Sequence, residues 1–234
     1  MPELNIHILC TRPVDESRIE EAKKEGITLD VLSFIETEAI QTIEIQQEIE
    51  WASVQETTVV FTSMNAVEAV TEMLDGHIPD WRIYSMGYKT KQLVTDYFGE
   101  GSIAGTADNA NDLADEIIEN EDPEELIFFC GNQRRNELPD KLKKHQVDVH
   151  EIVVYETIPV EHTVEKKYDA VLFFSPSAAE SFFRKNKLMA KTIVFAIGNT
   201  TAQTVSRFCS NQVIISKLPG KDELVEQALA YFTK

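Results

Sequence analysis

The chain has 234 residues, 43% of them hydrophobic and 26% charged, and 40 Asp and Glu against 22 Lys and Arg give it a formal net charge of -18. Such a composition is that of a globular protein, and the length allows one large domain or two small ones. The negative charge argues against nucleic acid or an anionic membrane as partner, because few cations remain to neutralise phosphates. It does not exclude a small anion held in a locally basic cleft.

Signals for export or membrane insertion are missing from the sequence. No apolar run approaches the roughly 20 residues of a membrane helix, and the start, MPELNIHILCTRP, lacks the basic residues and cleavage site of a signal peptide. Three cysteines (Cys10, Cys130 and Cys209) are widely spaced and form neither a disulfide framework nor a CxxC metal site. We expect a reduced, cytoplasmic protein.

In chain order, the first predicted elements are a strand at 4–9, a helix at 15–25 that ends at Gly26, and a second strand at 27–34. Further apolar strands, each followed by a helical segment, recur along the chain. The glycine-rich stretch GEGSIAG (99–105) follows the end of a helix and is expected to be a loop. Strands that alternate with helices predict an α/β fold with parallel sheets covered on both faces.

Internal similarity indicates a duplication. Two pairs of segments match in order: VVFTSMNAVEAV (59–70) with VLFFSPSAAESF (171–182), and IYSMGYKTKQLV (83–94) with VFAIGNTTAQTV (194–205). The spacing from Ser63 to Gly87 is 24 residues (87 − 63), and that from Ser175 to Gly198 is 23 (198 − 175). Such agreement in register is hard to obtain by chance.

The remaining segments also pair, at an offset of 120 residues (127 − 7): HILCTRP (7–13) with IFFCGNQ (127–133), and GITLDVLSFIETEA (26–39) with QVDVHEIVVYETIP (146–159). The chain therefore has the order A–B–A′–B′, with A at about 1–40, B at 54–118, A′ at 126–160 and B′ at 168–232. Two lobes would each combine one A-type and one B-type segment. The repeat leaves two pairings open, A with B, or B with A′ and A with B′.

Candidate ligand-binding residues lie at the predicted carboxyl ends of the strands, where open parallel sheets bind ligands. Most are small, hydroxyl-bearing or glycine, and several lead directly into helices, whose free N–H groups bind carboxylate or phosphate. Taken singly, each Ser, Thr or Asn has the alternative role of a helix cap. Together they would line a cleft between two facing lobes. The residues are Thr11, Arg12, Thr62, Ser63, Asn65, Gly87, Asn132, Ser175, Ser177, Gly198, Thr200 and Thr201.

Arg134 and Arg135 stand together in an otherwise acidic chain. They follow the Gly131-Asn132 break at the end of a predicted strand and are expected to open a helix, where cations oppose the helix dipole. An anionic ligand would compensate them, so both join the candidate binding residues. Plain surface exposure is the alternative.

Standard enzyme motifs are mostly missing. The sequence holds no Walker loop and no GxGxxG, and its five histidines show neither metal-ligand spacing nor a neighbouring nucleophile. Such a site would act by binding and orienting its ligand. One rival is a noncatalytic two-lobed binder of a small polycarboxylate; a nucleotide enzyme is disfavoured by the absence of phosphate loops.

Five stretches together resemble the uroporphyrinogen-III synthase family: FTSMNAVEA, CGNQRRNELPDKL, VYETIP, FFSPSAAESF and AIGNTTAQTV. They occur in the family's order and spacing, and the resemblance covers essentially the whole chain. The sequence departs from the family pattern at Lys91, where Ala is common, and at Met64-Asn65, where Pro-Arg or similar often stands.

The resemblance implies two Rossmann-like or flavodoxin-like lobes joined by a two-stranded linker, which selects the pairing of B with A′. One lobe would comprise 1–36 plus 160–234 and the other 37–159, with crossing segments near 33–40 and 153–160. It further implies a monomeric lyase that needs neither metal nor organic cofactor. Its substrate would be hydroxymethylbilane, cyclised to uroporphyrinogen III with inversion of ring D and loss of water.

Tyr155, in VYETIP, matches the family's tyrosine near the leaving hydroxyl, and the resemblance implies general-acid assistance there. The alternative is a linker aromatic packed between lobes. Arg134 and Arg135 match a polar stretch that borders the family's cleft, so at least one is expected to meet a substrate carboxylate.

Overall fold

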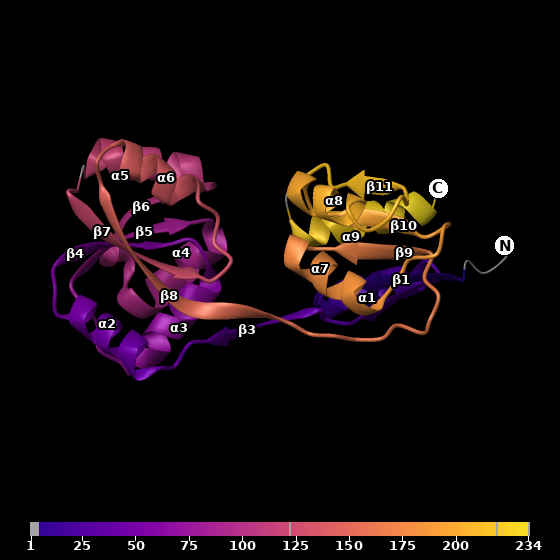
Figure 1. Ribbon diagram of the computed structural model, residues 1–234, viewed down its shortest axis with the longest axis horizontal. Coiled ribbons are helices and arrows are strands. Elements are labelled where there is room, and N and C mark those ends of the chain that lie inside the picture. Colours follow the sequence, from indigo (N-terminus) through magenta and orange to yellow (C-terminus); the bar gives the residue numbers. More distant parts are fainter. Residues whose placement is uncertain (1–4, 122, 219, 234) are drawn as a thin grey trace. The chain divides into compact units, whose positions relative to one another are not determined.

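The computed structural model describes residues 5–121, 123–218 and 220–233. The chain divides into two compact units, Met1–Glu36 with Ile158–Lys234 as the first and Thr37–Thr157 as the second (Figure 1). It passes from the first unit to the second within one strand and returns within another. In the part of the chain that is described, no helix is both long and apolar enough to cross a membrane.

The first unit is built on a five-stranded parallel sheet with the order β11-β10-β9-β1-β2. Its elements are β1 (Ile6–Cys10), α1 (Glu16–Lys24), β2 (Ile27–Val31), β9 (Ala170–Phe173), α7 (Pro176–Lys185), β10 (Ile193–Ala196), α8 (Asn199–Ser206), β11 (Val213–Ile215) and α9 (Lys221–Phe232). The predicted first strand, helix and second strand are confirmed, although the second strand ends at Val31 and residue 4 of the predicted first strand lies outside the described residues. Gly26 follows the helix at φ 72°, a conformation that favours glycine and stops the helix.

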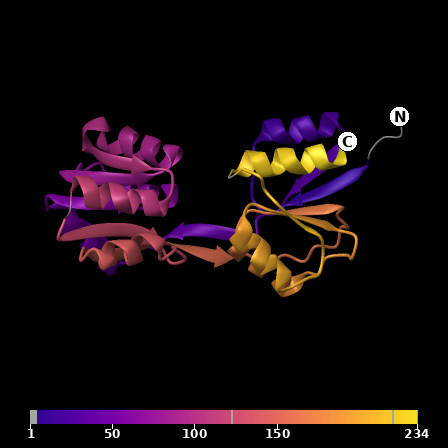
Figure 2. The same ribbon diagram turned by 90° about the horizontal axis from the view of Figure 1, so that it is seen from above.

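Alternate residues of the first sheet point to opposite faces, and helices cover both. Ile8 and Cys10 pack in one apolar cluster with α1 and α9, whereas Leu9 packs in the other with α7 and α8. Figure 2 shows α1 and α9 side by side on their face. Because both faces are covered, the strands read as continuous apolar runs.

The second unit is built on a six-stranded sheet with the order β3-β8-β7-β4-β5-β6. Its elements are β3 (Ile35–Ala39), α2 (Ile43–Ser53), β4 (Thr57–Phe61), α3 (Met64–Leu74), β5 (Trp81–Met86), α4 (Tyr88–Phe98), the 3-10 turn η1 (Glu100–Ser102), β6 (Ile103–Ala107), α5 (Ala110–Asn120), β7 (Glu125–Gly131), α6 (Glu137–Lys144) and β8 (Asp148–Pro159). Helices α5 and α6 cover one face (Figure 1), and α2, α3 and α4 cover the other.

Strands β3 and β8 are antiparallel to each other. The Ile40 amide donates to the Val154 carbonyl, and the Val160 amide donates to the Phe34 carbonyl, so residue numbers rise along one strand as they fall along the other. Both hydrogen bonds are 2.9 Å long. These two strands form the two-stranded connection through which the chain crosses from unit to unit.

Both sheets share one topology, as a duplication requires. The order β2-β1-β9-β10-β11 in the first unit corresponds to β8-β7-β4-β5-β6 in the second. The second sheet therefore joins segments B and A′. The α/β fold with two lobes and an internal duplication is confirmed, and both sheets are parallel apart from β3.

Two local predictions were wrong. The stretch 99–105 is no loop, because η1 and the first half of β6 occupy it. Arg134 and Arg135 do not open a helix: α6 begins at Glu137, after the N-cap Asn136. The two arginines lie in the turn between β7 and α6, so the helix dipole does not act on them as expected.

Candidate active site

The carboxyl edge of the second sheet brings several predicted residues to neighbouring strand ends. Phe61 of β4 is in register with Ser85 of β5 and with Phe129 of β7. The turns after these strands, which hold Thr62, Gly87 and Asn132, therefore lie along one edge. The edge includes the point between β7 and β4 where the strand order reverses, the usual binding place of a doubly wound sheet.

Tyr155 reaches this edge from β8 and lies against Gly131. Gly131 pairs with Tyr155 across a register shift between β7 and β8. A Cβ atom at position 131 would lie 2.6 Å from Cε2 of the Tyr155 ring and 2.7 Å from its Oη. Glycine at this position therefore makes room for the ring, which is half-buried and packs at its other side against the apolar cluster of α2, α3 and α4.

Asn132 ties the end of β7 to the end of β8. Its backbone amide donates to the Tyr155 carbonyl at 3.1 Å, and its side-chain Oδ1 accepts from the Thr157 amide at 3.0 Å. Gln133 adds a 3.4 Å contact from Nε2 to the Thr157 carbonyl. These bonds hold the β8 backbone from Tyr155 to Thr157.

Arg134 is half-buried and already paired. Its Nε donates to the Glu151 carboxylate and its Nη1 to Asn136 Oδ1, and the side chains of Arg134 and Glu151 are both 27% exposed. Burial, and after it the Glu151 carboxylate, raise the pKa of the neighbouring Cys130 thiol to about 11, with Arg134 opposing the shift. Arg135, in contrast, is exposed and has no ion pair with any described residue.

The turn after β4 caps helix α3. Ser63 Oγ accepts from the Ala66 amide at 3.4 Å, so this serine fulfils the alternative role of a helix cap. Thr62 and Asn65 are half-buried beside it. On the next strand, Gly87 starts α4 at φ 79°, and open space surrounds the position where a Cβ would stand.

A hollow of about 160 Å³ opens beside Tyr155 and Asn65. Its wall carries three carboxylates, and its lining residues are Thr37, Glu38, Ala39, Asn65, Glu68, Ala69, Glu72 and Tyr155. Glu38, Glu68 and Glu72 repel anions. Carboxylate groups of a ligand therefore fit the turns after β5 and β7 better than this hollow.

The first unit presents an equivalent edge with different detail. Thr11 is fully buried, and its hydroxyl donates to the Leu172 carbonyl at 2.8 Å, which fixes the turn after β1. Arg12, next to it, is exposed. Ser175 caps α7 by accepting from the Ala178 amide at 3.1 Å, and its Oγ lies 3.1 Å from that of Ser177.

Helix α8 of the first unit begins at Gly198, where a Cβ would meet open space. Thr200 in its first turn is exposed, whereas Thr201 is buried. As α4 does in the second unit, α8 offers a helix N-terminus without a side-chain cap at this edge.

A model of the family described as uroporphyrinogen-III synthase HemD matches residues 17–226. The chain belongs to the uroporphyrinogen-III synthase family. Family membership gives it uroporphyrinogen-III synthase activity, a lyase reaction of tetrapyrrole and haem biosynthesis, with hydroxymethylbilane as substrate.

Two solved structures share the fold of this synthase. Uroporphyrinogen-III synthetase from Helicobacter pylori is 17% identical with a TM-score of 0.68, and the match covers 97% of this chain and 99% of that one. A mutant uroporphyrinogen III synthase from the extremely thermophilic bacterium Thermus thermophilus is 14% identical with a TM-score of 0.65, and the match covers 97% of this chain and 98% of that one.

Sequence reasoning missed two residues that shape the candidate site of the synthase. Gly131 was seen only as a break after a strand, yet it makes room for Tyr155. Glu151 was not singled out, yet it holds Arg134. No sequence signal gives either contact: regular pairing of β7 with β8 would place residue 131 beside residue 154, the register shift after Cys130 brings it to residue 155, and Glu151 pairs with Phe128 in the sheet. No cluster of three or more potential metal ligands occurs among the described residues.

Proposed function

We propose that the synthase binds hydroxymethylbilane through the turns at the carboxyl edges of its two sheets, with Tyr155 beside the leaving hydroxyl. The observation that carries this is the placement of Tyr155 over Gly131, at the strand end that also bears Asn132 and Arg135. The proposed binding residues are those expected from the sequence, except Arg134, which is already paired, and Thr11 and Thr201, which are buried and shape their turns. The acetate and propionate arms of the substrate fit N–H groups, hydroxyls and guanidinium groups.

The roles of the two arginines differ in this proposal. Arg134 is held by Glu151 and Asn136, so it positions the turn that carries Asn132 and Arg135. Arg135 is free to meet a substrate carboxylate. Its guanidinium offers several donors in a fixed fork, which suits a carboxylate at an exposed edge.

Tyr155 acts as a general acid in the first step. Its phenol donates a proton to the hydroxyl leaving from the hydroxymethyl carbon, so that water departs and a cationic azafulvene remains. Its position is fixed from two sides, by the Asn132 bonds to the β8 backbone and by the close approach of Gly131. The acidic hollow beside the ring is a suitable neighbour for a developing positive charge.

Inversion of ring D is achieved by restraining the conformation of the bound substrate. Unassisted closure joins the chain ends without inversion, so the enzyme must hold the arms in a geometry that favours attack at the substituted carbon of ring D. A spiro intermediate then opens and recloses to give uroporphyrinogen III. Residues that hold the arms therefore control the isomer formed as well as the rate.

The test of this site is turnover of freshly prepared hydroxymethylbilane, with separation of the oxidised type III and type I porphyrins. We expect Tyr155→Phe to lower kcat by roughly 10²-fold or more, the scale of general-acid catalysis, with an unchanged unfolding midpoint. Near-normal kcat in that variant removes Tyr155 from the chemistry. Type III product from the unaltered protein is the positive control.

Arg135→Ala is expected to raise KM by roughly tenfold, the effect of one lost charge-assisted hydrogen bond. Arg134→Ala is expected mainly to lower the unfolding midpoint, since it leaves Glu151 without its partner. If neither variant changes KM, both arginines lie outside the substrate site.

We also propose a cytoplasmic monomer. The cysteines Cys10, Cys130 and Cys209 are all free, and the first two are buried, which suits a reducing compartment. Light scattering coupled to gel filtration tests the oligomeric state, and a mass twice that of the chain overturns it.

A further inference from the structure

Two large apolar side chains are exposed at the starts of neighbouring helices in the second unit. Met64 is the first residue of α3 and is 37% exposed, and Tyr88 is the first residue of α4 and is 79% exposed. Phe61 of β4 and Ser85 of β5 are in register, and each helix begins three residues later. Met64 and Tyr88 therefore occupy equivalent places at the carboxyl edge that carries the candidate site.

The duplication shows that the fold does not require large apolar side chains at these places. In the first unit, the corresponding helices α7 and α8 begin with Pro176 and Asn199. Proline is favoured at the first position of a helix, whereas tyrosine is only a moderate helix former. The helix starts of the second unit thus carry two exposed apolar side chains that the same fold does without in the first.

Both side chains lean toward the edge at which the substrate is proposed to bind. The side chains of an α-helix tilt toward its N-terminus, and the N-termini of α3 and α4 lie at this carboxyl edge. Asn65, which follows Met64, lines the hollow beside Tyr155. Gly87, which precedes Tyr88, has open space where a Cβ would stand. The two apolar side chains are therefore neighbours of residues already proposed to bind the substrate.

The strand order arranges these residues in a row. Along the order β8-β7-β4-β5, Tyr155 lies on the first strand where β7 ends, Met64 follows the third strand and Tyr88 follows the fourth. Neighbouring strands are about 4.8 Å apart, so the three intervals of this row span about 14 Å. A linear chain of four pyrrole rings can extend along such a row with its hydroxymethyl end at Tyr155.

We propose that Met64 and Tyr88 bind the pyrrole rings of hydroxymethylbilane, with the Tyr88 ring stacked on one of them. This inference rests on the proposed function and adds the contacts that it lacks, because the residues assigned there meet the carboxylate arms and the leaving hydroxyl. Aromatic pairs are stabilised by offset stacking, and the polarizable thioether of methionine packs favourably against a ring. Small-molecule sites combine apolar and aromatic surface for the body of the ligand with a few polar groups that fix its orientation.

Steady-state kinetics of Tyr88→Ala with hydroxymethylbilane test the stacking. We expect KM to rise roughly tenfold, the effect of one lost aromatic contact, and kcat to change less, because the ring is held in the ground state and the transition state alike. The unfolding midpoint should stay unchanged, since the Tyr88 side chain is largely exposed. Tyr88→Phe keeps the ring and should recover most of the affinity. Met64→Ala should raise KM by roughly threefold, the effect of a weaker sulfur–ring contact.

Trp51→Ala is the matched control for the aromatic substitution. Trp51 is also exposed, but it lies at the opposite edge of the second unit. There it lines a hollow together with Thr57 and Asp148, the first residues of β4 and β8. Trp51→Ala should keep the KM of the unaltered protein.

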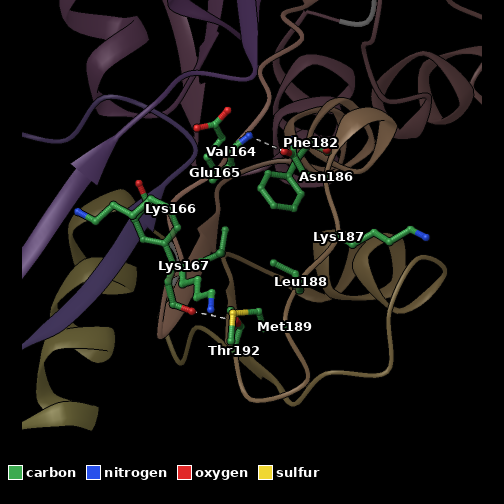
Figure 3. A pocket seen from close by; sticks show the side chains of 12 residues that line it. Val164, Glu165, Lys166, Lys167, Phe182, Asn186, Lys187, Leu188, Met189 and Thr192 are labelled. Carbon is green, nitrogen blue, oxygen red and sulfur yellow. Dashed lines mark hydrogen bonds between the residues drawn. The ribbon is translucent and has the colours of Figure 1, made fainter.

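Met189→Ala is the matched control for the methionine substitution. Figure 3 shows this exposed methionine beside Thr192, which directly precedes β10, so it lies at the amino edge of the first sheet. Met189→Ala should likewise leave KM unchanged.

Arg135→Ala separates this inference from the proposed function on which it rests. If Arg135→Ala raises KM and Tyr88→Ala does not, the edge remains the substrate site and the ring contacts are overturned. If neither variant changes KM, the site and the ring contacts are both overturned. Equal increases of KM in Tyr88→Ala and Trp51→Ala would also contradict the stacking, because Trp51 lies at the opposite edge.

Discussion

Glycine at position 131 determines where the Tyr155 ring can lie. A methyl group there would stand 2.6 Å from Cε2 of Tyr155, far inside contact distance. The Tyr155 ring packs against the apolar cluster and also borders the hollow, so an added methyl group would push the ring away from its present position. Tyr155, the side chain proposed for catalysis, can therefore take its position only because residue 131 has no side chain.

Gly131→Ala is therefore expected to destabilise the fold by about 1–3 kcal/mol, the cost of overpacking, and to lower kcat because the phenol is displaced. Urea unfolding and the isomer-resolved assay measure the two effects. Gly101→Ala is the control, since a Cβ at position 101 meets nothing within 4 Å. Equal stability of the two variants would contradict the close approach.

At the residue scale, sequence reasoning placed groups at the right strand ends but could not give their orientation. Asn132 was expected at the carboxyl edge, and it is there. That its Oδ1 accepts from the Thr157 amide depends on how β8 lies beside β7. Arg134 was given the same role as Arg135, yet only the fold reveals the Glu151 carboxylate beside it.

At the scale of elements, the apolar strands were predictable because buried parallel strands read as continuous hydrophobic runs. One exception is β6, whose sequence IAGTA is small and only partly buried. Gly105 lies there because a Cβ would stand 2.6 Å from Cε1 of the buried Tyr84. A glycine that signals a loop in sequence therefore serves close packing in an edge strand.

Helix α7 offers an element-scale prediction that separates capping from substrate binding. Ser175 caps α7, so Ser175→Ala should cost about 1 kcal/mol of stability. Ser175→Asp keeps an accepting oxygen and should retain that stability, while its charge should repel a substrate carboxylate and raise KM several-fold. Thermal unfolding and steady-state kinetics of both variants measure this. An unchanged KM in Ser175→Asp would leave Ser175 a cap alone.

At the scale of the whole molecule, the duplication accounts for both the likeness and the differences of the two units. Their sheets have corresponding strand orders, and corresponding strands end in the candidate residues. The repeat was readable in the sequence because strand, turn and helix start recur in register. The sequence did not show which A-type and B-type segments share a sheet, because both pairings satisfy the repeat. The choice depends on how β3 and β8 cross between the units.

The way β3 and β8 cross predicts that the first unit can fold without the second. The hydrogen bonds from Ile40 to Val154 and from Val160 to Phe34 fix an antiparallel register in which paired residue numbers sum to 194 (40 + 154 and 160 + 34). Glu36 and Ile158 are then directly opposite. A chain in which an Asn-Gly pair replaces 37–157 can close this pair as a tight hairpin, because Asn-Gly adopts the turn that such strands require.

We expect that shortened chain to unfold cooperatively, since the five-stranded sheet and both of its apolar clusters lie within the first unit. Circular dichroism during heating measures it, with the isolated segment 37–157 as its counterpart. Joining Glu36 to Pro159 instead shifts the register by one residue and turns each side chain of the strand to the wrong face, so that version should be less stable. If neither version gave a cooperative transition, the first unit would depend on the second for its folding, and the division of the chain into two units would describe geometry without independent stability.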